Sequence, residues 1–120
     1  SGGHSDTAAG AKMTIIVVPL IRGRLPMIRD HVQNVVTPGE SIDVVVTDYG
    51  IAINPLRRDL LDHFKGSGLN IKTIEELQAI AHKKVGRPEA VPLTDDIIGV
   101  IEYRDGSIID GIYAPGKSKF

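Results

Sequence analysis

β-Branched aliphatic residues dominate the apolar part of this 120-residue chain and constrain its fold more than any other feature. Ile and Val together number 27, whereas Leu numbers only 8. β-Branched side chains lose rotamer freedom in helices and pack well on pleated surfaces, so the sequence favours strands. Two segments, Thr14–Pro19 and Ile42–Thr47, consist almost entirely of such residues. Apolar runs of this length are typical of strands that are buried on both faces of a sheet.

Two amphipathic helices are expected in the middle of the chain. The first is predicted to start at Asn54-Pro55, because asparagine caps helices and proline fits a first turn, and to end at Gly66. The second is predicted to start at Thr73, with Glu76 completing a capping box, and to end at Gly86. Apolar residues recur at helical spacing in both segments: Leu56, Leu60, Leu61 and Phe64 in the first, and Ile74, Leu77, Ile80 and Ala81 in the second.

Further strand patterns lie on either side of these helices. Residues 28–37 alternate between apolar and polar types, which predicts a half-exposed strand followed by a turn at residues 37–40. The dipeptide Asp105-Gly106 separates the β-rich segments 97–103 and 107–113, which predicts a hairpin. The expected fold is therefore α/β, with a mixed, mainly parallel sheet, flanking helices and a C-terminal β-hairpin. Residues 1–113 are assigned to this fold and residues 114–120 to a disordered tail.

Charge and composition exclude several classes of function. The net charge is -1, so the chain has no basic field for gripping a phosphate backbone, and we expect no nucleic-acid partner. No apolar run approaches the roughly 20 residues of a membrane-spanning helix, so no membrane partner is expected. The absence of cysteine excludes disulfides and thiolate chemistry, which fits a cytoplasmic location.

No complete catalytic or metal-binding set is visible in the sequence, and no metal site is expected. Asp95 and Asp96 are adjacent, so on a strand they point to opposite faces and cannot act as an acid/base pair. Asp48 follows a buried strand, where functional residues often lie, but it serves equally well to cap the turn before Gly50. The four histidines are scattered, and the two on the expected helices are assigned to solvated faces: His4, His31, His63 and His82.

The first twelve residues are rich in small side chains and leave two interpretations open. One is a flexible tail, because chain ends are commonly disordered. The other is a glycine loop from a longer protein, leading into the strand at residue 14, because glycine lets a ligand or backbone approach closely. His4 is expected to be a solvated loop residue.

A set of separated motifs runs in order from residue 1 to residue 113: Gly2–Lys12, Val18–Leu20, Arg22–Arg24, Val36–Ser41, Val46–Asp48, Gly50–Pro55 and Glu102–Gly106. Together they resemble the C-terminal part of the citrate lyase alpha subunit family, whose members are citrate CoA-transferases. More distantly, the pattern is similar to the second half of the wider CoA-transferase superfamily. The resemblance implies that the fold is part of a CoA-transferase-like domain.

The resemblance also implies an activity and its partners. Alpha subunits of that family exchange the acetyl group on an acyl-carrier subunit for citrate, giving a citryl-carrier thioester and acetate. The implied partners are citrate, the acetyl thioester, and the beta and gamma (acyl carrier) subunits, while a homo-oligomer is left open. No cofactor is expected on this chain, because the reacting thiol belongs to CoA or to a CoA-like group on the carrier.

Site residues follow from the resemblance by position. The backbone of Gly2 and Gly3 is the implied catalytic contact to the acyl oxyanion, since two N–H groups supply dipoles without side-chain bulk. Asp6 is implied to hold that loop by accepting backbone N–H bonds, and His4 is grouped with it as substrate-binding.

The family's chain is far longer than this sequence. The segment that carries the catalytic glutamate of related transferases has no match here. We therefore expect these 120 residues to be a fragment that lacks transferase activity by itself. Two alternatives remain open: a CoA-transferase for another short acid, and a non-catalytic scaffold that docks partner subunits.

Overall fold

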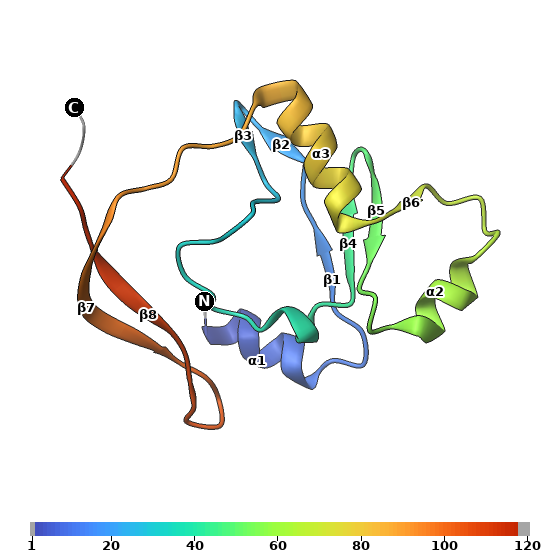
Figure 1. Cartoon of the computed structure of the whole chain (residues 1–120). Coiled ribbons are helices and arrows are strands. Elements are labelled where there is room, and N and C mark those ends of the chain that lie inside the picture. Colours follow the sequence, from blue (N-terminus) through green and yellow to red (C-terminus); the bar gives the residue numbers. More distant parts are fainter. Residues whose placement is uncertain (1, 118–120) are drawn as a thin grey trace.

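A four-stranded mixed sheet forms the centre of the computed structural model, which describes residues 2–117 (Figure 1). The strand order is β1-β4-β5-β6, and the outer pairs β1–β4 and β5–β6 are parallel, whereas β4–β5 is antiparallel. The strands are β1 (Ile15–Val17), β4 (Val44–Thr47), β5 (Gly50–Ile53) and β6 (Ile71–Lys72). The predicted α/β fold with a mixed, mainly parallel sheet is confirmed.

The tight turn between β4 and β5 depends on a glycine. Thr47 pairs with Gly50 across the turn, and the Thr47 hydroxyl donates to the Gly50 carbonyl at 2.8 Å. Gly50 has φ +151°, and a Cβ at this position would lie 3.1 Å from the Lys72 side chain and 3.2 Å from the Asn70 carbonyl. Glycine is therefore required where β5 meets the backbone that leads into β6.

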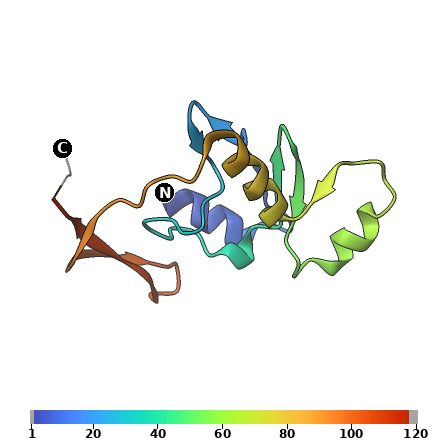
Figure 2. The ribbon, with the colours of Figure 1, turned by 45° about the horizontal axis from the view of Figure 1, so that its top comes forward.

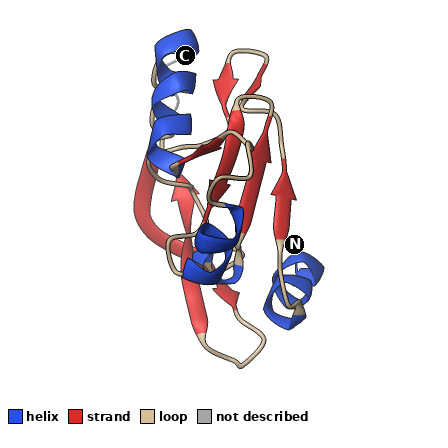
Figure 3. Ribbon diagram, turned by 90° about the vertical axis from the view of Figure 1, so that its right-hand side faces the viewer, coloured by secondary structure: helices blue, strands red, loops and turns tan. Residues whose placement is uncertain are grey.

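Helix α3 (Ile74–Val85) covers one face of the sheet, and Figure 3 shows it lying along one side of the strands. Its start matches the prediction, because the Thr73 hydroxyl accepts from the Glu76 N–H at 3.1 Å. Gly86 follows its end with φ +79°, as expected for a helix stop. The core between helix and sheet is aliphatic and consists of Leu20, Ala52, Leu77 and Ala81, with partly buried Ile74 and Ile80 packed against it.

Helix α2 (Arg58–Phe64) begins later than predicted, and Asn54 is not its cap. The Asn54 side-chain oxygen accepts from the Leu56 N–H at 3.0 Å, so it closes a turn that contains Pro55 before the helix. The predicted end is correct, since the helix stops at Phe64 and Gly66 has φ +76°.

The C-terminal hairpin is confirmed and is longer than predicted. It consists of β7 (Leu93–Glu102) and β8 (Ile108–Pro115), paired antiparallel with register shifts along the ladder. Figure 2 shows it standing apart from the sheet. The predicted tail is wrong at its start, because Ala114 and Pro115 belong to β8, and residues 118–120 lie outside the described residues. A second, small hairpin joins β2 (Ile21–Arg22) to β3 (Leu25–Pro26).

One strand prediction is wrong, and another is correct only in part. Residues 28–37 form no strand, and the turn after them is the 3-10 helix η1 (Gly39–Ser41). The Val35 N–H donates to the Asp110 carboxylate at 2.8 Å, so a side chain takes the place of a partner strand. The strand predicted over residues 14–19 is present only as β1. The strand is not buried on both faces, since Ile15 is 47% and Val17 78% exposed. Among the described strands, only β4 pairs with β1.

The N-terminal segment is neither a flexible tail nor a glycine loop but a helix, α1 (Gly2–Gly10). Ser5 and Ala8 are buried on one side of it, and the Thr14 hydroxyl donates to the Ala8 carbonyl at 3.2 Å. Small side chains permit this close packing of the helix on the rest of the chain, which compensates for the low helix propensity of glycine. Within residues 2–117, no helix is long and apolar enough to cross a membrane.

Candidate functional site

The residues predicted for the site lie on the first two turns of α1. Gly2 and Gly3 lie in the first described turn of α1. The space around Gly3 is open, because a Cβ placed there would meet nothing within 4 Å. The two glycines thus lie on a helix and not in the glycine loop that was one of the two interpretations of the sequence.

His4 and Asp6 are both exposed on α1 but do not act together in this structure. The His4 ring accepts from or donates to the Thr37 hydroxyl, with 2.7 Å between Nδ1 and Oγ1. This bond places His4 on a helix against the segment before η1, not in a solvated loop. The Asp6 carboxylate accepts no backbone N–H from another residue in the part of the chain that is described, so the expected bracing role is not seen. Their role in substrate binding stays a prediction.

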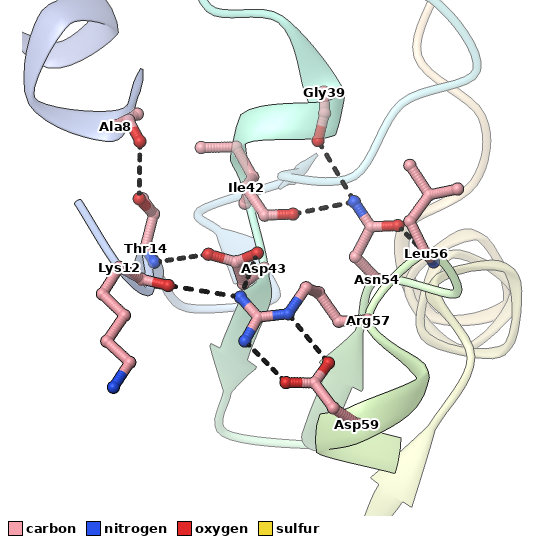
Figure 4. Close-up of polar contacts among 10 residues, drawn as sticks. All are labelled: Ala8, Lys12, Thr14, Gly39, Ile42, Asp43, Asn54, Leu56, Arg57 and Asp59. Carbon is pink, nitrogen blue, oxygen red and sulfur yellow. Dashed lines mark hydrogen bonds and ion pairs between the residues drawn. The ribbon is translucent and has the colours of Figure 1, made fainter. Parts of the chain in front are cut away.

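Asp43 directly precedes β4, at the end of the sheet that lies nearest to α1, and several polar contacts converge on it (Figure 4). It is 8% exposed, and its Oδ2 accepts from the Thr14 N–H at 2.7 Å. Its backbone N–H donates to the Thr14 carbonyl at 3.0 Å, and its carbonyl accepts from the Asn54 N–H at 2.8 Å. Asp43 therefore ties the α1–β1 junction to β4 and to the end of β5.

Arg57, in the turn before α2, forms an ion pair with Asp43 and a second one with Asp59. Its Nη1 lies 2.8 Å from Asp43 Oδ1, and its Nε and Nη2 each donate at 3.0 Å to the two carboxylate oxygens of Asp59 (Figure 4). Hydrogen bonds to Asp59 and Asp43 raise the pKa of Arg57, and the same Arg57 bonds lower the pKa of Asp59. Both carboxylates engage the guanidinium, so the group is a structural clamp and not a free cation for an acidic ligand.

The amide of Asn54 joins the clamp to the segment that His4 contacts. Its Nδ2 donates to the Ile42 carbonyl at 2.9 Å and to the Gly39 carbonyl at 3.3 Å (Figure 4). Segment 37–43 thus runs from His4 on α1, past Asn54, to Asp43. Three motifs that are distant in the sequence, Gly2–Lys12, Val36–Ser41 and Gly50–Pro55, meet in this region.

A cavity of about 710 Å³ opens beside this region, between the sheet and the two helices that flank it. Its walls are mostly aliphatic, from Val44, Ala52, Leu61 and Ile74 among others. Asn54, Lys72 and Glu75 are among the polar residues that line it. This volume lies within the range of ligand pockets.

Other candidates from the sequence do not assemble into a site. Asp48 accepts from the Leu20 N–H at 2.9 Å, so it anchors the segment after β1 and does not cap its own turn. His63 is exposed as predicted, but His82 is half-buried and its Nε2 lies buried without a partner in the described structure, so its assignment to a solvated face is wrong. Across residues 2–117, no group of three or more potential ligands could hold a metal ion.

Sequence reasoning missed Asp43, Asn54 and Arg57 as members of one polar group. A usable signal exists for Asp43, because a carboxylate beside the run of valines in β4 is expected to be buried and must then find donors. Its partner could not be chosen from the sequence, since several arginines are available.

Comparisons with known proteins agree with each other and with this fold. The family described as citrate lyase, alpha subunit (CitF), matches residues 1–114. The citrate lyase alpha chains of Klebsiella pneumoniae and Escherichia coli are 54% identical over 112 residues and 44% identical over 113 residues, which is 93% and 94% of this chain. A crystal structure described as an alpha subunit of citrate lyase from Streptococcus mutans, in complex with citrate, is 50% identical and superposes with a TM-score of 0.91 over 96% of this chain.

The fold and the comparisons together show that this chain is an α/β portion of an enzyme subunit. The chain belongs to the citrate lyase alpha subunit family. It spans about a fifth of the length of these relatives, covering 22% of the Klebsiella pneumoniae chain and 22% of the Streptococcus mutans chain.

Proposed function

We propose that this chain is the part of a citrate lyase alpha subunit that supports transfer of a carrier-bound thioester from acetyl to citrate. In this reaction citrate and the acetyl-carrier thioester give the citryl-carrier thioester and acetate. The observation that carries the proposal is the 0.91 TM-score and 50% identity to an alpha subunit whose crystal structure contains citrate. The proposed partners are citrate, the acetyl thioester, and the beta and gamma subunits of the complex.

In this proposal the first turn of α1 stabilises the oxyanion that forms when the thioester carbonyl is attacked. The proposal requires that the helix also begins at these glycines in the full-length subunit. The N–H groups of Gly2 and Gly3 then have no partner within the helix, and the helix dipole places partial positive charge at the same end. Donors fixed by the backbone need no reorganisation during the reaction, which is the physical basis of oxyanion stabilisation.

The test compares two substitutions of Gly3 in a full-length alpha subunit that contains this sequence. Gly3→Pro removes one N–H, while proline is tolerated in a first helical turn. Gly3→Ala keeps that N–H, and its Cβ meets nothing within 4 Å. We expect turnover to fall about 100-fold or more in the proline variant, the scale for one lost oxyanion donor, and to be retained in the alanine variant. Equal turnover in both variants would refute the role of this N–H.

A scaffold function is the second candidate, and one observation favours it. The partly buried ion pair between Asp43 and Arg57 holds segments of the fold together, so these two charged side chains have a structural role and not a catalytic one. Titration calorimetry of the 120-residue chain separates the two functions. Binding of the carrier subunit without any binding of CoA would favour a scaffold, whereas binding of both would favour a role in transfer.

A further inference from the structure

One hydrogen bond joins two of the separated sequence motifs, Gly2–Lys12 and Val36–Ser41, through their side chains. Nδ1 of His4, on α1, lies 2.7 Å from Oγ1 of Thr37, although the two residues are 33 positions apart in the chain. His4 is exposed, and Thr37, just before η1, is half-buried. A hydrogen bond that water can replace contributes only modestly to stability, so its larger effect is on the orientation of the His4 ring.

The backbone that carries Thr37 is held by a braced turn. Thr37 precedes Pro38, and a residue before proline is restricted to extended conformations. The Pro38 carbonyl accepts from the Ser41 N–H at 3.0 Å and from the Ser41 hydroxyl at 2.6 Å. The Asn54 amide, at the end of β5, donates to the Gly39 carbonyl at 3.3 Å. The Thr37 hydroxyl is therefore presented to α1 from a position that is fixed relative to the sheet.

The same bond determines which ring nitrogen of His4 carries a proton. Among the residues that the structure describes, neither the Thr37 hydroxyl nor Nε2 of His4 has another hydrogen-bond partner. The hydroxyl proton is therefore satisfied when it is donated to Nδ1. A neutral imidazole has a single N–H, so when Nδ1 accepts, the ring proton is on Nε2. In the charged form both nitrogens carry protons, so Nε2 is a donor in either form.

The surroundings of His4 leave room for a ligand. Its neighbour Gly3 has open space around it, because a Cβ placed there would meet nothing within 4 Å. An N–H that is held in one direction binds an oxygen more tightly than a freely rotating one, because less rotational freedom is lost on binding. Citrate, the acid of the proposed function, offers carboxylate oxygens, which are strong acceptors for such a donor.

We propose that Thr37 is a positioning residue for His4: its hydroxyl donates to Nδ1, so that Nε2 carries a proton and donates it in a hydrogen bond to a carboxylate of citrate. Thr37 does not itself touch the ligand in this arrangement. The inference rests on the proposed function, because it takes citrate as the ligand.

Calorimetric titration of citrate into the full-length alpha subunit tests the inference without requiring turnover. Thr37→Val keeps the β-branched shape but removes the hydroxyl, and it should weaken citrate binding about 10-fold, the scale of one lost hydrogen bond. Thr37→Ser keeps a hydroxyl and should restore most of the affinity. The same Kd for citrate in the valine variant and in the unchanged subunit would overturn the proposal.

A double-mutant cycle shows whether Thr37 acts through His4. His4→Ala should weaken citrate binding at least as much as Thr37→Val does. Adding Thr37→Val to His4→Ala should then change the Kd no further, because the hydroxyl has no ring left to orient. Additive losses would overturn the proposal, since Thr37 would then act independently of His4.

Ser41→Ala is the matched control within the same turn. It removes the hydroxyl that bonds to the Pro38 carbonyl and leaves the contact between Thr37 and His4 in place, so the Kd for citrate should stay unchanged. A loss as large as that of Thr37→Val would show that any loosening of the turn weakens binding, which would overturn the specific role of Thr37.

The same titration separates this inference from the proposed function. A full-length subunit that binds citrate with the expected differences but does not transfer the thioester would contradict the proposed function and support the positioning role. A subunit that transfers the thioester but binds citrate equally in all variants would do the reverse. A subunit that binds no citrate would overturn both.

Discussion

Asp43 Oδ1 lies 2.8 Å from Nη1 of Arg57, and this contact joins the start of β4 to the turn before α2. The same carboxylate accepts from the Thr14 N–H, so one side chain holds three segments that are separate in the sequence. The contact therefore ties together the end of the sheet that lies next to α1, a helix that itself offers mainly small side chains.

Asp43→Ala is expected to lower the free energy of unfolding by about 1–3 kcal/mol, because the Thr14 N–H loses its acceptor at a buried position. Asp43→Asn keeps an oxygen acceptor of the same shape and should recover part of this loss. Urea unfolding followed by circular dichroism measures both. An unchanged midpoint in the alanine variant would show that the clamp does not stabilise the fold.

The pKa of Asp59 is expected to rise toward the ordinary value of about 3.9 in Arg57→Gln, since hydrogen bonds from Arg57 hold it low. A lowered folded-state pKa means that Asp59 stabilises the fold above the unfolded-state pKa. That contribution is lost as the pH falls through the folded-state pKa. Carboxyl chemical shifts in an NMR titration report the change directly. Asp105, whose pKa is lowered by Ser107, is the internal control and should not move.

Gly50→Ala is expected to cost about 1–3 kcal/mol of stability, because alanine disfavours φ +151° and its Cβ would press on the Asn70 carbonyl. Gly10→Ala is the matched control, since its added Cβ would meet nothing within 4 Å. Thermal unfolding compares the two. A Gly50→Ala chain as stable as the control would mean that the turn into β5 can relax.

Asp110→Ala is expected to loosen the C-terminal hairpin without unfolding the sheet. The Asp110 carboxylate accepts from the Val35 N–H at 2.8 Å, and beside it the Asn34 amide donates to the Gly111 carbonyl at 3.0 Å. Loss of the first bond should speed hydrogen exchange in β7 and β8 while the amides of β4 and β5 stay protected. Asp96→Ala, on an exposed part of the same hairpin, should change neither.

Local sequence signals predicted the elements whose structure depends on neighbouring residues. Thr73 and Glu76 defined the start of α3, and Gly86 its end, because a cap needs only side chains within one turn. The β7–β8 hairpin followed from Asp105-Gly106 for the same reason. The family was likewise visible in the order of its motifs, and the comparisons confirmed it.

The predictions of secondary structure were wrong where contacts with a distant segment determine the local conformation. Residues 28–37 alternate like a strand but pair with no described strand, and the N–H of Val35 bonds instead to the Asp110 side chain. Gly2–Gly10 lacks the apolar periodicity of a helix, and contacts with Thr14 and Thr37 hold it.

The sequence by itself therefore determined the α/β class, the capped helix α3, the hairpin and the family. Only the tertiary structure decided that residues 2–10 form a helix, that β1 lies at the edge of the described sheet, and that Arg57 is the partner of Asp43. The physical reason is that capping and turn formation involve a few adjacent residues. By contrast, the partner of a buried carboxylate or of a strand edge is whichever segment the fold brings within hydrogen-bonding distance, and that segment can lie far away in the sequence.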